Sequence, residues 1–163
     1  MIANEKGGLL EALRMAQAAE QKAAQLYADA ANETSNPPAR ELFEKLAAFE
    51  RHHYEKLVEQ EKQLRAGDAF AEYEGHDNLE LSSPGEVAKI EEPARKSAME
   101  VVSMAMEIEQ EAQDRYNSLA DETTDPDGRA MFRRLAEEEH SHYLVLSDAY
   151  FSLSNGRGWD VPE

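Results

Sequence analysis

The stretch FEKLAAFERHHYEKL, residues 43–57, has apolar side chains spaced three and four apart, which is typical of one face of an amphipathic helix. This face includes Phe43 and Leu46. The two positions that should come next on it hold Glu50 and His53 instead of apolar residues. A carboxylate and an imidazole on a core-facing surface need partners, because burying an unpaired charge costs much free energy.

A second copy of this pattern occurs later in the chain. A shift of 89 residues places Glu50 on Glu139 and His53 on His142, and the match needs no gap from about residue 11 to residue 146. Self-similarity of this length indicates a duplicated structural unit. Other matched pairs are Glu20 and Glu109, Tyr27 and Tyr116, Pro37 and Pro126, Phe43 and Phe132, and Leu57 and Leu146.

Each copy is predicted to form two helices with a short break between them. The breaks are SNPPAR and TTDPDG, in which Asn36 and Asp125 can cap the following helices and a proline occupies the first turn. We also expect a short turn of helix after Ser83 and Pro84, whereas the tail, residues 155–163, is too short for a helix. The predicted helices are Gly8–Thr34, Pro37–Arg65, Pro93–Thr124 and Pro126–Ser154.

The four helices are predicted to form one all-α domain, residues 1–163. Two hairpins, about residues 8–65 and 93–154, are joined by a crossover, residues 66–92. At about 3.3 Å per residue this crossover can run the length of a bundle, so the second and third helices can be parallel. A four-helix bundle with one long crossover is the ferritin-like arrangement.

Each predicted helix carries one glutamate on its core-facing stripe. Glu20 and Glu50 are equally far from the first break, and Glu109 and Glu139 are equally far from the second. Two of the helices continue with a histidine one turn later. The hairpins, paired by a pseudo-twofold axis, therefore place four carboxylates and two imidazoles in one layer. The stripes are Leu13, Ala16, Glu20, Ala23, Tyr27; Phe43, Leu46, Glu50, His53, Leu57; Val102, Ala105, Glu109, Ala112, Tyr116; and Phe132, Leu135, Glu139, His142, Leu146.

This layer predicts a site for two metal ions. Four buried carboxylates cannot all stay ionised without cations, and two divalent ions bring the matching charge. Glutamate and histidine together suit Fe(II) or Mn(II) better than the thiolate-rich sites of structural zinc. The alternative is a metal-free bundle in which these groups hydrogen-bond to one another. The predicted metal ligands are Glu20, Glu50, His53, Glu109, Glu139 and His142.

Other polar residues on or near the stripes can be explained without a role as metal ligands. Tyr27 and Tyr116 are interpreted as core residues with a satisfied hydroxyl group, or as residues that act beside the metal centre. His52 and His140 point at least about 100° away from the stripe, so we expect them at the surface. His76 lies in the crossover, and nothing in the sequence distinguishes it.

The chain resembles the rubrerythrin-like di-iron proteins of the ferritin-like superfamily. The resemblance covers about residues 8–154 and rests on AQAAEQKAAQLY, FERHHY, AMEIEQEAQDRY and EEEHSHY. It implies that the six residues named above bind two iron ions, and that the centre reacts with hydrogen peroxide or dioxygen. In that hypothesis Glu20 and Glu109 are terminal ligands, Glu50 and Glu139 bridge, and each histidine binds one metal ion.

The sequence departs from rubrerythrins in two ways. Rubrerythrins carry a rubredoxin domain with four cysteines, but this chain has no cysteine, so the expected electron donor is a separate molecule. Rubrerythrins also have an extra glutamate one turn after the third-helix ligand, where this chain has Ala112. The set is thus closer to that of bacterioferritin. Two alternatives to the di-iron oxidoreductase are a ferroxidase or iron-handling protein without sustained turnover, and a metal-free acidic helical interaction module.

The composition limits the partners. With 34 acidic against 17 basic residues the net charge is −17, which disfavours nucleic acid. No stretch approaches the roughly 20 apolar residues of a membrane span, and the first residues lack the apolar run of a secretory signal. We therefore expect a cytoplasmic protein, and a homodimer is the first expectation for its assembly.

Overall fold

Four long helices form the structure, a computed structural model that describes residues 3–67, 69–70, 72–75 and 92–156. They are α1 (Ala3–Glu33), α2 (Pro37–Arg65), α3 (Ala94–Glu122) and α4 (Pro126–Ser154). In the described residues all regular structure is helical, as the composition predicts. None of these helices combines the length and apolar character that crossing a membrane requires.

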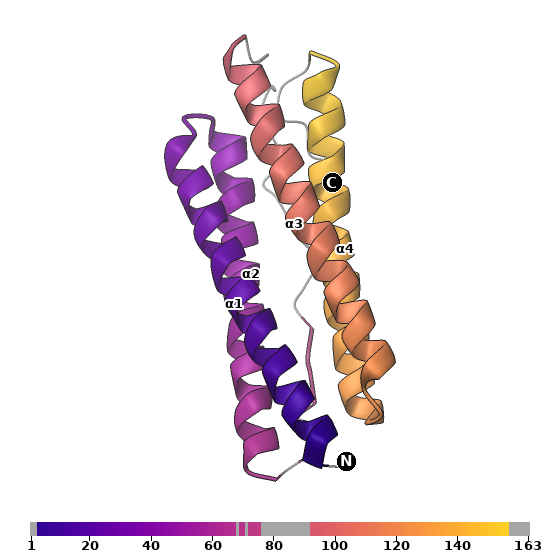
Figure 1. The fold of residues 1–163 in the computed structure, drawn as a ribbon. Helices are drawn as coiled ribbons and strands as arrows, with labels where there is room; N and C mark the ends of the chain where they lie inside the picture. The colour runs from indigo at the N-terminus through magenta and orange to yellow at the C-terminus, as the bar shows by residue number, and fades with distance from the viewer. Residues whose placement is uncertain (1–2, 68, 71, 76–91, 157–163) are drawn as a thin grey trace.

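The helices pack as two antiparallel hairpins, α1 with α2 and α3 with α4, and α1 of the first hairpin lies beside α3 of the second. The two hairpin loops lie at opposite ends of the molecule, and α2 and α3 run in the same direction (Figure 1). This is the predicted ferritin-like bundle with one long crossover. The duplicated halves are thus related by a rotation that exchanges the two ends.

The two breaks form in the same way. The Asn36 side chain accepts a hydrogen bond from the Ala39 N–H group at 3.1 Å, and Asp125 accepts from the N–H groups of Asp127 and Gly128 at 2.9 and 3.0 Å. Each cap is followed by proline at the first helical position. These local signals explain why the predicted bounds of α2 and α4 agree with the structure.

The bounds of the other two helices differ from the prediction. α1 begins at Ala3 rather than at Gly8, because a glycine in a helix costs only about 1 kcal/mol and adjacent helix-forming residues offset it. α3 spans Ala94–Glu122, so it begins one residue later and ends two residues earlier than expected. The proposed turn after Ser83, and His76, lie outside the described residues.

The core has two apolar parts with a polar layer between them. One part is built around Tyr27, Phe43 and Leu146, and the other around Tyr116, Phe132 and Leu57. Every residue of the four predicted stripes is buried. The polar residues of the stripes therefore lie in the middle of the bundle, with apolar side chains toward both ends.

Candidate metal centre

The structure brings together the six polar residues of the stripes. None of their side chains is more than 2% exposed. Each hairpin contributes two glutamates and one histidine, because the break lies midway between the two glutamates of each copy. The residues that meet in this layer are Glu20, Glu50, His53, Glu109, Glu139 and His142.

These residues form two overlapping groups that could each hold a metal ion. In each group, one ligand atom per residue lies within 4.8 Å of every other. Glu50 and Glu139 belong to both groups. The first group is completed by Glu20 and His53, and the second by Glu109 and His142. Two adjacent positions that share two carboxylates have the geometry expected for a pair of bridged cations.

The histidines present their Nδ1 atoms to the carboxylates. His53 Nδ1 lies 2.6 Å from Glu139 Oε1 and 3.6 Å from oxygens of Glu20 and Glu50. His142 Nδ1 lies 3.4 Å from Glu50 Oε1 and 3.6 Å from Glu109 Oε2. The two rings are nearly parallel, with centroids 6.1 Å apart. Both imidazoles are thus oriented toward the shared glutamates.

Burial and mutual repulsion divide the four carboxyl groups into two kinds. Burial, together with the charge of Glu20, raises the pKa of Glu50 to about 8, and burial beside Glu50 raises the pKa of Glu139 well above its usual value. Burial would also raise the pKa of Glu20, but a hydrogen bond with Glu50 and the charge of His53 outweigh it and lower this pKa to about 2. The pKa of Glu109 is likewise lowered, against the effect of burial, by Glu139 and His142.

The two imidazoles hold protons strongly when no metal competes. Burial alone would lower the pKa of His142, but the charge of Glu109 and hydrogen bonds with the carboxylates raise it to about 9. The pKa of His53 is raised well above its usual value for the same reason, with Glu139 and Glu20 as the main charges. Two imidazolium groups therefore balance the two ionised carboxylates, Glu20 and Glu109.

The chemistry of the site fits divalent cations. One buried oxygen of each glutamate accepts no hydrogen bond of good geometry among the described residues: Glu20 Oε2, Glu50 Oε1, Glu109 Oε2 and Glu139 Oε1. Two of them lie beside an imidazole, because Glu139 Oε1 is 2.6 Å from His53 Nδ1 and Glu50 Oε1 is 3.4 Å from His142 Nδ1. Buried carboxylate oxygens without donors are rare in folded proteins, because each carries a desolvation penalty. Cations placed among these oxygens would satisfy them.

The tyrosines of the stripes bridge the two hairpins. Tyr27 donates its hydroxyl hydrogen to Glu109 Oε1 at 2.7 Å, and Tyr116 donates to Glu20 Oε1. Each ring stacks on a phenylalanine of the neighbouring helix, Phe43 for Tyr27 and Phe132 for Tyr116. Both tyrosines thus have satisfied hydroxyl groups and contact the site directly.

Two of the remaining histidines are resolved outside the layer. His52 is half-buried and His140 is exposed, and neither belongs to a metal-ligating group in the described part of the chain. Helical phase predicted this for both. The prediction of a surface position is less accurate for His52, because its side chain is partly covered.

Sequence reasoning missed Glu138 and Tyr73. Glu138 is 4% exposed, and its Oε2 lies 2.8 Å from His53 Nε2 and accepts a hydrogen bond from the Tyr73 hydroxyl at 2.7 Å. Glu138 lies within a run of three glutamates and one residue from the stripe, so periodicity did not separate it from surface residues. The available sequence signal was a departure from the repeat: the shift of 89 residues relates Glu138 to Phe49, so a glutamate occurs here in only one of the two copies.

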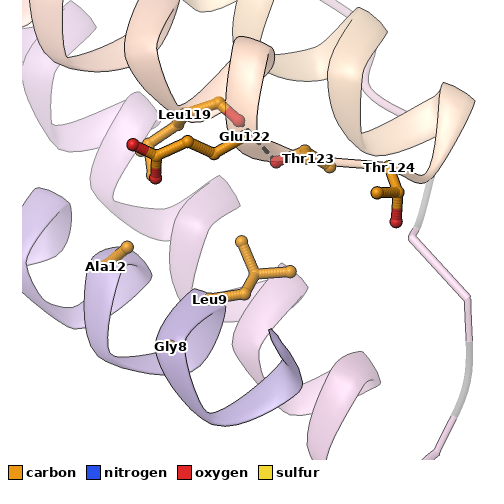
Figure 2. Close-up of a pocket in the computed structure, with 7 residues that line it drawn as sticks. All are labelled: Gly8, Leu9, Ala12, Leu119, Glu122, Thr123 and Thr124. Atoms are coloured by element: carbon orange, nitrogen blue, oxygen red, sulfur yellow. Dashed lines mark hydrogen bonds between the residues drawn. The ribbon is translucent and has the colours of Figure 1, made fainter. Parts of the chain in front are cut away.

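Two cavities near α1 and α3 differ in their relation to the layer. One, about 190 Å³, lies between the two helices and is lined by Ala23 and Ala112 together with Glu20, Glu50 and Glu139. Another, about 240 Å³, lies between the start of α1 and the end of α3. Figure 2 shows Leu9 and Ala12 facing Leu119 and Glu122 there, and none of the six residues lines it.

Comparisons with known proteins agree with this architecture. The rubrerythrin family model matches residues 2–61, which include α1 and most of α2. A hypothetical protein from Pyrococcus furiosus has a similar structure, with a TM-score of 0.71, 27% identity and coverage of 90% of both chains. No curated protein matches the chain significantly. The first hairpin of the chain therefore matches the rubrerythrin family model over residues 2–61, and the four helices form a ferritin-like bundle that buries a glutamate and histidine cluster.

Proposed function

We propose that the protein is a non-haem di-iron oxidoreductase that reacts with hydrogen peroxide or dioxygen. The observation that supports it most is the pair of overlapping carboxylate and imidazole groups, which share Glu50 and Glu139. In this proposal the catalytic centre and the metal ligands are the same residues. They are Glu20, Glu50, His53, Glu109, Glu139 and His142, with Tyr27 and Tyr116 beside them.

The ligand roles follow the overlap of the groups. Glu50 and Glu139 would bridge the two ions, Glu20 and His53 would complete one position, and Glu109 and His142 the other. Two Fe(II) ions held by these residues would supply two electrons, which with two protons would reduce one molecule of hydrogen peroxide to two water molecules. The same residues would also suit Mn(II), which prefers similar ligands.

The surrounding residues prepare the site for this chemistry. The tyrosine hydroxyl groups hold one oxygen of Glu20 and Glu109, and the other oxygen of each glutamate would be available to a cation. The apolar parts of the core on either side keep bulk water out. The cavity beside Ala23 and Ala112 is large enough for a small oxidant, since a water molecule occupies about 30 Å³ of liquid.

The partners remain predictions. Because the chain has no cysteine, sustained turnover needs an external electron donor. The acidic surface disfavours nucleic acid as a partner, and a homodimer and a cytoplasmic location are still expected. The single domain predicted over residues 1–163 is also part of this proposal.

Metal loading followed by oxidation tests the proposal. Protein loaded anaerobically with Fe(II) should bind about two ions per chain, and added peroxide should produce the near-ultraviolet absorption of an oxidised di-iron centre. The double variant Glu50→Ala, Glu139→Ala should lose both signals. An exposed control, Glu137→Gln, should keep them. Equal iron binding by the double variant would contradict the proposal.

A ferroxidase or iron-handling role is the second candidate. The observation that favours it is Ala112, where the peroxidase-type family members have an additional glutamate. Such a role predicts a single oxidation per bound iron pair and release of the product iron. Continued consumption of peroxide in the presence of a chemical electron donor would argue for the oxidoreductase instead.

A metal-free interaction module makes a different prediction. In that case treatment with a chelator leaves the melting temperature unchanged. If metal ions bind the folded state, adding Fe(II) or Mn(II) should raise the melting temperature, because a ligand bound only by the folded state stabilises it.

A further inference from the structure

The two halves of the duplicated site differ in what lies behind each histidine. The shift of 89 residues relates Glu138 of α4 to Phe49 of α2. Glu138 Oε2 lies 2.8 Å from His53 Nε2, on the side of the ring away from the shared glutamates. At the corresponding place in the other half, the Phe49 ring stacks on His142 with centroids 5.2 Å apart. A phenyl ring can orient an imidazole but provides no carboxylate acceptor for it.

Glu138 is held by groups that the duplication does not provide twice. Tyr73 donates a hydrogen bond to Glu138 Oε2 at 2.7 Å, and Arg134 Nε donates to Glu138 Oε1 at 3.2 Å. Tyr73 belongs to the crossover, which occurs once in the chain. On α2, the residue related to Arg134 is Lys45, which pairs with Glu41 at 3.4 Å.

The crossover approaches α4 closely at this point. A Cβ atom on Gly75 would lie about 2.5 Å from Glu138 Oε1, so the backbone there leaves no space for a side chain. A Cβ atom on Gly128 would lie 2.6 Å from the ring of Phe70, another crossover residue. The crossover therefore packs against α4 on the side of Glu138, and it buries this carboxylate over one histidine of the pair.

We propose that Glu138 is a positioning residue that makes the two metal positions unequal, so that the position of His53 binds a divalent ion more tightly than that of His142. This inference rests on the proposed di-metal function. A carboxylate that accepts the Nε2 hydrogen fixes the tautomer with a free Nδ1 lone pair, holds the ring in place and increases the basicity of Nδ1. His53 Nδ1 is the atom directed at Glu20, Glu50 and Glu139.

Equilibrium titration with Co(II) tests the inequality without relying on catalysis. Wild-type protein should bind two Co(II) ions in two resolved steps. Glu138→Phe, which copies the residue of the other half, should weaken the tighter step by roughly 10- to 100-fold and bring the two steps together. Glu138→Gln should have a smaller effect, because the amide oxygen still accepts the hydrogen bond without the negative charge.

Two further variants separate positioning from general damage. Tyr73→Phe removes only the hydroxyl group that donates to Glu138, so it should weaken the tighter step by less than Glu138→Phe does. Glu137→Gln makes the same charge change at a neighbouring residue whose side chain is 71% exposed, and it should leave both steps unchanged. Co(II) absorption spectra should show the change in the environment of one ion only.

The outcomes distinguish this inference from the proposed function. If wild-type protein binds two Co(II) ions and Glu138→Phe and Tyr73→Phe leave both steps unchanged, the inequality is wrong and the metal site stands. Equal weakening of both steps in Tyr73→Phe would also overturn it. If wild-type protein binds no Co(II), Mn(II) or Fe(II), the proposed function itself fails, and the inference fails with it.

Discussion

Two small residues, Ala23 and Ala112, lie beside the polar layer and line the cavity that reaches it. Ala23 and Ala112 are related by the duplication, and both line the cavity that reaches Glu20, Glu50 and Glu139. Larger side chains at these positions would separate the buried oxygens from the space between α1 and α3. The two alanines therefore control the room available to a small molecule at the site.

Ala112→Leu should slow the reaction of the loaded site while leaving metal binding intact. The larger side chain fills part of the cavity of about 190 Å³, so azide binding and peroxide reaction should fall about tenfold or more, at a cost of about 1–3 kcal/mol in stability. Stopped-flow absorption measures the first effect and thermal melting the second. Ala18→Leu, on the exposed side of α1, is the control. Unchanged rates would show that small molecules enter elsewhere.

Among the elements, the caps repeat more completely than the sequence match indicated. Gly67 and Gly156 are also related by the shift of 89 residues, and both have positive φ angles, 83° and 74°. Their N–H groups donate to the carbonyl groups of Leu64 and Leu153 at 3.2 and 3.1 Å. The duplicated unit thus includes the end of its second helix, where glycine adopts a left-handed conformation without strain.

Gly128→Ala should destabilise the protein by about 1–3 kcal/mol, because the new methyl group would meet the Phe70 ring and displace the crossover from α4. Gly8→Ala is the matched control, for which we expect a change in stability of the opposite sign. Its methyl group has open space in α1, so it should stabilise by about 0.5–1 kcal/mol. Urea unfolding measures both changes. A stable Gly128→Ala variant would show that the crossover adjusts to the extra methyl group.

Local and periodic signals were sufficient to predict most of the bundle and the polar layer. The caps and prolines determined α2 and α4, and the stripe with its repeat placed Glu50 and its partners together. Glu138 could not be predicted, because its burial depends on Tyr73 and Gly75 of the crossover, where no periodicity constrains the position. The start of α1 was missed because Gly7 and Gly8 resemble a helix boundary in isolation.

At the scale of the whole molecule, the site exchanges protons for metal ions. The pKa values are raised for Glu50, Glu139, His53 and His142, to about 8 for Glu50 and about 9 for His142, which favours their protonated forms, whereas the lowered pKa values of Glu20 and Glu109 favour the ionised forms. Two divalent ions should therefore displace about four protons, which leaves the site neutral in both states. Titration of weakly buffered protein with Co(II) and a pH indicator measures the release. Release of fewer than two protons would contradict this charge balance.

The stability of the metal-free protein should fall as the pH rises from about 6.5 to 9. The pKa of His142 is raised from 6.5 to about 9 in the folded state. Its contribution to the free energy of unfolding is therefore complete below pH 6.5 and is lost as the pH rises through 9. The pKa of Glu50 is raised from 4.5 to about 8, so this carboxyl group also makes the folded protein less stable as the pH rises. The pKa of Glu20 is lowered, and its contribution to stability is already constant above pH 4.5. Urea unfolding with and without Co(II) measures this, and a metal-free protein that gains stability in this range would contradict it.

The opposite placement of the two hairpin loops has a consequence for ancestry. Since each hairpin brings two glutamates and one histidine to the middle of the bundle, a single hairpin could complete such a site by pairing with an identical copy. In that ancestor every mutation would appear twice. Once both copies lie in one gene, one half can change alone, and Phe49 and Glu138 are positions where the inherited symmetry no longer holds.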